Sequence, residues 1–467
     1  MNDIANVLSG LLAQFSDANR LYALEGEGAV FKTLLVERWS GWEALSCGFA
    51  FDIDCLSTDA SLPLDDVLGK RLSLLTRRAE GGLTRRTGLI SAAECSGADG
   101  GLARYRLRLV PWIHLLAQGR HNRVFQDKTV QQIVETVFAC YGNLASWRLS
   151  EDVGAFLQDV RPRSHCAQYR ESDWDFLSRL LAEEGLGFSI VDDPDVPAGH
   201  TVVIFADSSR LPQDASAATQ GGIRFHRDAS TEASDAIQGL GMCRQMGSTH
   251  LTWVTQDYKQ NRALAVQMPL RQAIQSVRLE RYDPAGPYAF ASRQEADRYL
   301  RLAADALEAQ QDRWLGFGSV RTLRAGTCAS VLQLPGDSGS TQLVFTAVNQ
   351  LGINNLPDAL QEYLERELGE HAPSGVGSEV DPILLPETIE FLKESNAPAI
   401  ATRRNERARS VGYAVDFRAV PQDRLWRAVL RDDTGARWNP RPTARGAQTA
   451  LVVGPDGEAS AGTIGEV

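Results

Sequence analysis

The chain has 467 residues, of which 43% are hydrophobic and 23% are charged. A chain of this length and composition can form about three globular domains, each with its own buried core. The formal net charge of -11 repels the phosphate backbone of nucleic acids, which excludes a general nucleic-acid role unless a local basic patch reverses the field. No run of about 18 consecutive apolar residues is present, so the sequence predicts no helical membrane span.

The first segment, from Met1 to Phe15, has apolar residues at helical spacing and carries Asp3 but no basic residue. This pattern predicts a docking helix rather than a signal peptide. Seven cysteines are scattered along the chain without any C-x-x-C spacing. An odd and irregular set is not typical of a disulfide framework, so we expect reduced thiols in a cytosolic protein.

Residues 20–118 carry the pattern of strands with one buried face. The stretch from Leu45 to Cys55 alternates apolar with polar residues, and residues 104–109 alternate arginines with apolar residues up to Pro111. We therefore expect a strand-rich domain with one face in solvent, closed or nearly closed into a barrel. Asp52 and Asp54 share the polar face. They are interpreted as solvated carboxylates rather than a cation site, because no third ligand is near them.

Helical spacing begins in the next segment. After Asp127, which is interpreted as a cap, residues 130–141 place their apolar side chains on one face of a helix. A second helix begins at Ser172, which forms a capping-box-like pair with Asp175, and ends at Gly185. These helices and their flanking strands predict an α+β domain.

The following part of the chain mixes strands and helices. Residues 201–205 and 342–348 have the composition of strands. Ser292 and Glu295 open a long alanine-rich helix that extends to about Arg313. One domain inserted into another would explain this mixture.

Two short helices are expected near the end of the chain, one from Pro357 to Gly369 and one that begins at Pro386. Residues 371–381, rich in Pro, Ser and Gly, are expected to link them. The densest basic run follows and is interpreted as a solvated loop. It comprises Arg403, Arg404, Arg407 and Arg409.

A search for catalytic groups finds only weak candidates. His165 and Cys166 are adjacent, but neighbours in a strand point to opposite faces, so they are a poor nucleophile and base pair. No H-x-x-x-H motif, Cys-His metal spacing or complete phosphate-binding glycine motif is present. Glu183 and Glu184 end a helix where the macrodipole disfavours them, and we interpret them as ion-pair partners of arginines such as Arg179. The sequence thus predicts a non-enzymatic scaffold or assembly protein, with no catalytic residue, no metal site and no cofactor.

The segment from Arg163 to Phe188 resembles the most characteristic motif of the VgrG family of type VI secretion spike proteins, Q-Y-x-E-[ST]-D-x-x-F-x-x-R-L-x-E-x-E-G. Ordered matches at this many positions are not explained by chance. The matching residues are Gln168, Tyr169, Glu171, Ser172, Asp173, Phe176, Arg179, Leu180, Glu184 and Gly185.

Further blocks resemble the family in the same order along the chain, at residues 86–90, 105–125, 282–288 and 413–454. The resemblance covers roughly residues 20–350 and 411–458. Two departures stand out. Residues 350–410 are longer and more helical than the family's usual connection, and the chain stops at Val467, before the rest of an OB fold and a β-helical needle. We therefore expect a truncated spike.

The resemblance implies an α+β, strand-rich fold like that of a phage baseplate hub, with two tube-type β-barrel domains surrounded by α+β elements and followed by the start of an OB fold. The implied boundaries are an N-terminal helix at 1–19, a first tube-type barrel at 20–118, an α+β domain at 119–195, a second tube-type barrel with a helical insertion at 196–350, a helical insertion or linker at 351–412, and the truncated start of an OB fold at 413–467.

The resemblance also implies a function. A spike hub of this kind is a structural homotrimer that docks on an Hcp-like hexameric tube protein, contacts baseplate proteins and carries secreted effectors or adaptors into target cells by contractile injection. It is assembled in the cytoplasm without a signal peptide and is then secreted or injected, with no nucleic-acid partner and no membrane span. Two alternatives stay open. One is the hub of a prophage-like contractile tail, and the other, from a different class, is a spike-borne enzyme such as a peptidoglycan hydrolase.

Overall fold

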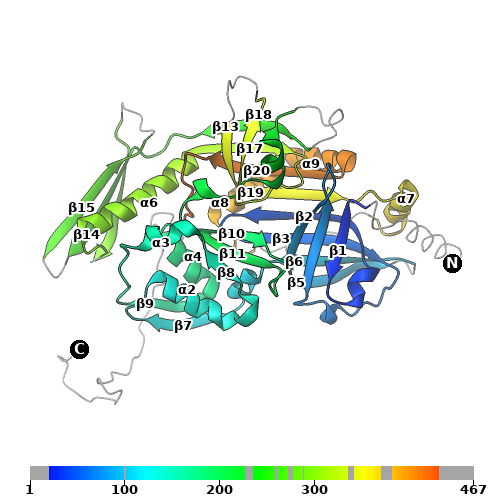
Figure 1. Cartoon of the computed structure of the whole chain (residues 1–467), viewed down its shortest axis with the longest axis horizontal. Coiled ribbons are helices and arrows are strands. Elements are labelled where there is room, and N and C mark those ends of the chain that lie inside the picture. Colours follow the sequence, from blue (N-terminus) through cyan, green and yellow to red (C-terminus); the bar gives the residue numbers. More distant parts are fainter. Residues whose placement is uncertain are drawn as a thin grey trace, which may run out of the picture.

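The computed structural model describes residues 20–98, 101–226, 235–257, 261–271, 277–287, 289–334, 341–369 and 381–430. The predicted helix at the N-terminus, nearly all of the predicted linker at 371–381 and most of the expected OB-fold region lie outside these ranges. Strands and helices are both present and strands dominate, which confirms the predicted strand-rich α+β class (Figure 1).

Twelve strands within the described residues form one large sheet. Its first half runs in the order β1-β4-β5-β6-β3-β2. Asn354 joins the two ends of this half, because its amide nitrogen donates to the backbone oxygens of Tyr22 in β1 and Val36 in β2. The strands of this half are β1 (Tyr22–Gly26), β2 (Leu35–Ala44), β3 (Gly48–Ser57), β4 (Arg71–Arg77), β5 (Leu83–Ala98) and β6 (Ala103–Val110). The strand predicted from Leu45 therefore begins three residues later, after a turn.

The second half of the sheet continues directly from the first, because β2 pairs antiparallel with β19. From β19 the order continues through β20 and β17 to β13, while β18 also pairs with β19 and β12 pairs with β18. These strands are β12 (Ile223–Arg224), β13 (Ile237–Arg244), β17 (Asp312–Gly318), β18 (Thr327–Leu332), β19 (Thr341–Ile353) and β20 (Tyr413–Pro421). Strand β20 was assigned to the start of an OB fold, but it lies between β19 and β17 in the large sheet, which corrects that assignment for its nine residues.

The polar face of β3 and β6 is covered by protein rather than by water, which corrects the prediction of a solvated face. Arg106 is 7% exposed and its Nε lies 2.6 Å from Asp54 Oδ1. Arg108 contacts both Asp52, at 3.1 Å, and the distant Asp381, at 3.2 Å. Segments remote in the sequence close this face, since helix α7 (Asp358–Glu367) packs its leucines against those of β2 and β3. The strand pattern alone could not reveal this cover.

A smaller α+β unit lies at the lower left in Figure 1, below the second half of the large sheet. It contains a three-stranded sheet in the order β10-β11-β8 and a two-stranded sheet of β7 and β9. Its elements are β7 (Arg120–Phe125), α2 (Val130–Phe138), β8 (Trp147–Leu149), α3 (Glu151–Leu157), β9 (Cys166–Ser172), α4 (Asp173–Glu183), β10 (Gly187–Asp192) and β11 (His200–Phe205). Helix α2 is capped by Thr129 in a capping box with Gln132, not by Asp127 as predicted, because Thr129 is the residue whose side chain reaches the third backbone amide.

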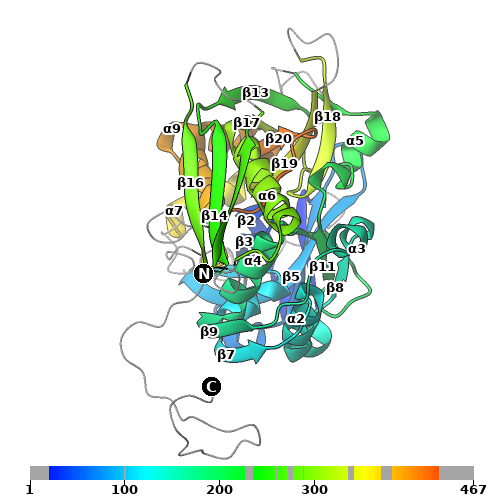
Figure 2. The ribbon, with the colours of Figure 1, turned by 90° about the vertical axis from the view of Figure 1, so that its left-hand side faces the viewer.

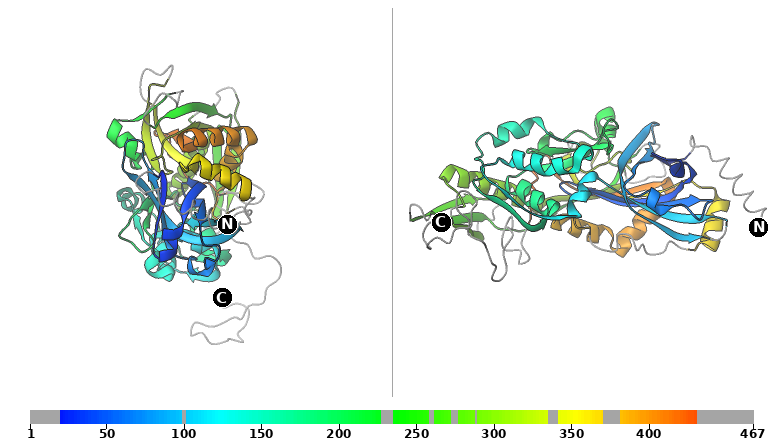
Figure 3. Two further views of the ribbon diagram at one scale, coloured as in Figure 1. Left: turned by 90° about the vertical axis from the view of Figure 1, so that its right-hand side faces the viewer. Right: turned by 90° about the horizontal axis from the view of Figure 1, so that it is seen from below.

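A second unit projects from one end of the molecule, opposite to α7 (Figures 1 and 3). The long helix α6 (Arg293–Gln311) packs on one face of a three-stranded sheet formed by β14 (His250–Asp257), β15 (Arg262–Pro269) and β16 (Glu280–Pro287) (Figure 2). Ser292 caps α6 by accepting from the backbone nitrogen of Glu295, as predicted. The alanines of α6 permit this close approach because their side chains are small.

Three helices lie between β19 and β20 in the part of this segment that the structure describes. Besides α7, these are α8 (Pro386–Ser395) and α9 (Pro398–Val411), and α9 packs against β20 and β19. The arginine run predicted as a solvated loop lies in α9, so that prediction was wrong. Pro398 at the first position and Gly412 just after the last one fix the limits of this helix. None of the described helices is long and apolar enough to cross a membrane.

Candidate functional site

The motif from Gln168 to Gly185 forms a continuous piece of structure in the α+β unit. It starts in β9, turns at Ser172 into α4 and ends before β10. The capping box predicted at this turn is present, because Ser172 Oγ accepts from the backbone nitrogen of Asp175 and the Asp175 side chain accepts from the backbone nitrogen of Ser172. The local sequence thus determines where the helix begins.

Asp173 holds the beginning of α4 in place. Its carboxylate is fully buried and accepts hydrogen bonds from Arg123, Gln168 Nε2 at 2.7 Å, the Tyr141 hydroxyl at 2.9 Å and His121 Nδ1 at 2.9 Å. Burial alone would raise the pKa of Asp173, but these hydrogen bonds, first of all the one from Arg123, outweigh it and lower the pKa. The carboxylate therefore stays charged and acts as a fixed acceptor, which suits a structural role better than proton transfer.

Arg179 bridges the helix to the strand before it. Its Nε and Nη2 donate to the two oxygens of Glu171 at 2.9 and 2.6 Å, and Nη2 also donates to the backbone oxygen of Ala167. The guanidinium lies over the Phe176 ring, which in turn stacks on Phe125. Arg179 is thus engaged with Glu171, whereas we had expected it to pair with the glutamates at the end of the helix.

Glu184 is the centre of a second cluster at the other end of α4. Its side chain is 1% exposed and receives Arg163 Nη2 at 2.7 Å, Arg298 Nη1 at 3.0 Å and the Tyr299 hydroxyl at 2.9 Å. The neighbouring Glu183 also pairs with Arg163, at 2.7 Å. Glu183 and Glu184 are ion-paired, as predicted, but the arginines come from other elements, including α6.

Gly185 allows the two units to approach closely. Its φ is +74°, and a Cβ at this position would lie 2.7 Å from Leu302 Cδ2 in α6. Its backbone oxygen accepts from Arg427 Nη1 at 2.6 Å, so a stretch after β20 is also fixed here. Only glycine combines this left-handed conformation with the required lack of a side chain.

The remaining motif residues contribute mainly apolar and aromatic packing. Phe176 and Leu180 are fully buried in the core of the α+β unit. Tyr169 is half-buried, with the Arg170 guanidinium 5.4 Å from its ring centre. The structure therefore gathers the ten motif residues into one helix with its flanks, anchored at both ends by buried carboxylates.

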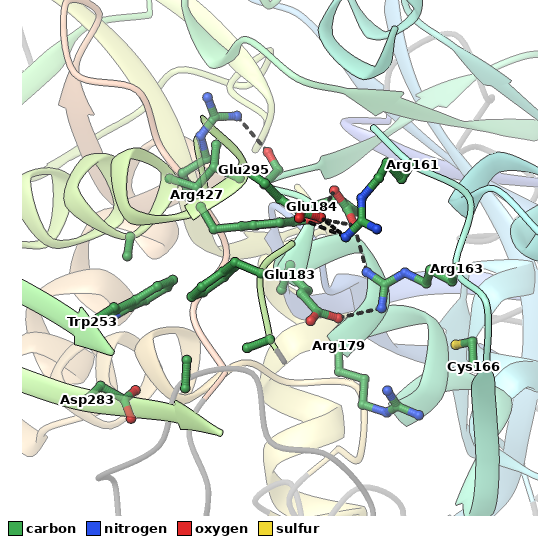
Figure 4. Close-up of a pocket in the computed structure, with 18 of the residues that line it drawn as sticks. Arg161, Arg163, Cys166, Arg179, Glu183, Glu184, Trp253, Asp283, Glu295 and Arg427 are labelled. Carbon is green, nitrogen blue, oxygen red and sulfur yellow. Dashed lines mark hydrogen bonds and ion pairs between the residues drawn. The ribbon is translucent and has the colours of Figure 1, made fainter. Parts of the chain in front are cut away.

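A cavity of about 440 Å³ lies between this motif and the projecting unit (Figure 4). One wall is formed by Trp253 and Phe290, whose rings stack at 5.8 Å, and the opposite wall carries Arg163, Arg179 and Cys166. Arg161 closes one side by contacting Glu295 of α6 at 2.8 Å. Four arginines and four carboxylates are among the residues that line the cavity, so it has no dominant charge.

These side chains form no recognisable catalytic arrangement among the described residues. His165 is exposed and Cys166 is buried, consistent with the opposite directions expected of neighbours in a strand. The described residues contain no group of three His, Cys, Asp or Glu side chains that could hold a metal ion. The seven cysteines are thiols in the structure. Among the described residues, these contacts hold three separate segments together, namely the motif, α6 and the stretch around Arg427.

Sequence reasoning missed the partners that complete the site. Arg123, Arg163, Arg298 and Tyr299 come from elements that are adjacent only in the folded chain. The one available signal was the presence of two consecutive glutamates at a helix end, which required basic partners without saying which. Arg427 gave no signal, because its role depends on backbone oxygens at Gly185 and Ala206.

Comparison with known proteins places this geometry in a family. The sequence model of the phage tail baseplate hub (GPD) matches residues 42–356, which is more than half of the chain. The chain belongs to the phage tail baseplate hub family. Its matched region includes both the complete motif and α6, the two parts that meet around Glu184.

Curated relatives with similar sequences are type VI secretion spike proteins. The chain is 25% identical over 430 residues to the spike protein VgrG1b of Pseudomonas aeruginosa, covering 91% of this chain and 49% of the relative. It is 26% identical to VgrG1a of the same organism, covering 91% of this chain and 56% of the relative. The chain thus spans about half the length of these two relatives. The actin cross-linking toxin VgrG1 of Vibrio cholerae is 32% identical over 209 residues, covering 42% of this chain and 18% of the toxin.

Solved structures show the same hub-like fold. One is the E. coli c3393 protein, described as a type VI secretion component similar to the T4 tail proteins gp27 and gp5. It has a TM-score of 0.54 and 17% identity, and the match covers 86% of this chain and 78% of that one. The 43 kDa tail protein of prophage MuSo2 from Shewanella oneidensis has a TM-score of 0.53 and 10% identity, covering 87% of this chain and 100% of that one. The predicted phage baseplate hub-like fold is confirmed.

Proposed function

We propose that this chain is the hub portion of a type VI secretion spike of the VgrG kind. In this role it assembles as a homotrimer, docks on a hexameric Hcp-like tube, contacts the baseplate and carries effectors or adaptors toward target cells. The observation that carries the proposal is the combination of the hub-family match over residues 42–356 with spike-protein similarity along 91% of the chain.

The form of the large sheet supports docking on a tube. Its two halves meet at the pairing of β2 with β19, and each half contributes a separate set of strands. If each half acts as one tube-type barrel, then three copies present six similar units. A trimer of that kind matches a six-fold ring, which is the geometric requirement for joining a hexameric tube to a three-fold spike.

The proposed role is structural rather than enzymatic. Its physical requirements are shape and interface area, and the motif serves them by joining α4, α6 and the stretch around Arg427. We propose that the ten motif residues are needed for the fold of the hub and contribute no chemistry. A spike-borne enzyme is the alternative. A zymogram on peptidoglycan with the full-length gene product tests it, and clearing by the described region alone would overturn the structural role.

A hub of a prophage-like contractile tail is the second candidate, favoured by the fold likeness to the MuSo2 tail protein along its whole length. An epitope-tagged copy in the bacterium that encodes the protein separates the two. Release into the medium is expected to stop when the gene for the type VI contractile sheath is deleted. Release that continues without this sheath and rises on prophage induction would favour the tail.

Light scattering of the purified chain across a wide concentration range tests the trimer. The mass is expected to rise from one subunit toward three, because association depends on concentration when each interface is modest. A stable dimer would contradict the hub role, since a dimer cannot present three-fold symmetry to a tube.

A further inference from the structure

The basic run in α9 forms an organised cluster on the outer side of the large sheet. The guanidinium carbons of Arg403 and Arg407 lie 3.7 and 4.5 Å from the ring centre of Phe317 in β17. Arg404, the third member, is directed at the carboxylate of Asp416 in β20, at 2.7 Å. We call Arg403, Arg404, Arg407 and Phe317 the arginine cluster.

The arginine cluster has more positive charge than its surroundings neutralise. Asp416 accepts from Arg403 at 3.1 Å and from Arg404, so one buried carboxylate serves two guanidinium groups. Arg407 forms no ion pair or hydrogen bond within the described part of the chain, and its contact is with the Phe317 ring. Three cations facing one anion leave a local excess of two positive charges.

This excess of positive charge lowers the stability of the folded chain. Arg403 and Arg407 are four residues apart on one helix, where like charges repel each other and destabilise the helix. Burial, and then the charge of Arg403, lower the pKa of Arg407, while Asp416 acts in the opposite direction. Arg86 and Arg179, by contrast, each face a carboxylate in this structure. A cation that has no carboxylate partner among the described residues, as Arg407 has none, is a candidate binding group.

The surroundings of the arginine cluster define what could bind there. Leu315 lies two residues from Phe317 on the same face of β17 and is 36% exposed. Gly239, opposite Phe317 in the neighbouring strand β13, leaves room for the ring, since a Cβ there would lie 2.1 Å from it. The surface therefore offers two stacked guanidinium groups beside an exposed apolar side chain.

We propose that the arginine cluster is a docking site for an acidic segment of a partner protein, one that places a carboxylate on Arg403 and Arg407 and an apolar side chain on Leu315. Guanidinium groups bind carboxylates with two parallel hydrogen bonds, and stacking on Phe317 holds them ready, which lowers the entropy lost on binding. The net charge of -11 disfavours a long polyanion such as nucleic acid, whereas a short acidic peptide meets only the local field. The proposal goes beyond the hub function and does not depend on it.

The test uses the purified whole chain and a fluorescein-labelled peptide of alternating glutamate and leucine, followed by fluorescence anisotropy. We expect this peptide to bind, and a matched peptide of alternating lysine and leucine not to bind. Arg407→Gln should weaken binding at least about tenfold, which corresponds to about 1.4 kcal/mol. This variant removes no ion pair from the fold and relieves the repulsion between Arg403 and Arg407, so its circular dichroism should match that of the wild type and its melting temperature should not fall.

Two further variants make the test specific. Arg407→Lys keeps the charge but loses the planar guanidinium, so it should also weaken binding. Arg409→Gln removes an exposed charge from the same helix without touching Phe317 and should leave binding unchanged. The proposal is overturned if the wild type does not bind the acidic peptide, if Arg409→Gln weakens binding as much as Arg407→Gln, or if a single-stranded oligonucleotide competes more strongly than unlabelled peptide. None of these outcomes depends on trimer formation or secretion.

Discussion

Acid should destabilise this protein through His200, a fully buried histidine in β11. Its Nε2 lies 3.0 Å from the backbone nitrogen of Trp112, and its Nδ1 lies 2.9 Å from the backbone oxygen of Ala198. Since the Trp112 nitrogen can only donate, Nε2 must accept, and the single ring proton is on Nδ1. A second proton on Nε2 would face a donor and break this bond.

The size of the effect follows from the shift in pKa. Burial lowers the pKa of His200 from its ordinary value of 6.5 to about 4. Because the folded pKa lies below the unfolded one, the stabilisation is complete above pH 6.5 and is lost as the pH falls through about 4. The full difference is about 3 kcal/mol, of which roughly 2 kcal/mol is lost by about pH 5.

Urea unfolding followed by circular dichroism measures this loss. The free energy of unfolding of the wild type should fall between about pH 7.5 and pH 5 by roughly 2 kcal/mol more than that of His200→Gln, which has no titrating ring. The contributions of the other titrating groups to the free energy of unfolding cancel in this comparison, because both proteins contain these groups. His165→Gln, at an exposed histidine, is the matched control and should behave like the wild type. Equal falls in wild type and His200→Gln would refute the argument.

Three further predictions concern the motif and the thiols. Leu180→Ala should lower the free energy of unfolding by about 2 to 5 kcal/mol, since it empties a fully buried site, and an unchanged melting temperature would refute this. Asp173→Asn should cost about 3 kcal/mol or more in the same urea assay, because it leaves a guanidinium without its carboxylate, and a loss below about 1 kcal/mol would show that the charge is not needed. In thiol titration with a disulfide reagent, exposed Cys95 and Cys140 should react in the native protein, whereas Cys47, whose pKa is raised by burial to about 12, should react only after unfolding. Fast reaction of Cys47 in the native state would contradict its burial.

The hub-like fold could be recognised from sequence because the motif combines local signals. Ser172 with Asp175 and Ser292 with Glu295 begin their helices as predicted, since a cap acts within three residues of the chain. The same locality explains why Gly185 ends its helix as expected. The error at Asp127 was also local, as Thr129 offered the better cap two residues later.

What the sequence could not determine was which distant groups meet. Glu184 was expected to pair with Arg179, yet its partners Arg163 and Arg298 come from different elements, and Arg179 binds Glu171 instead. The sequence contains many arginines that could pair with Glu184. The energies of these alternative ion pairs differ too little for the sequence to predict which pair forms.

By itself, the sequence determined the class of fold, the beginning and end of the motif helix and the family resemblance, because capping and apolar spacing act over a few residues. Only the tertiary structure decided that Arg104 and Arg106 of β6 are buried, that α7 packs on the leucines of β2 and β3, and that Arg403 and Arg407 of α9 gather on Phe317. These outcomes depend on which segments cover a face. Strand pairing and helix packing between residues hundreds of positions apart determine that cover, and no local pattern encodes it.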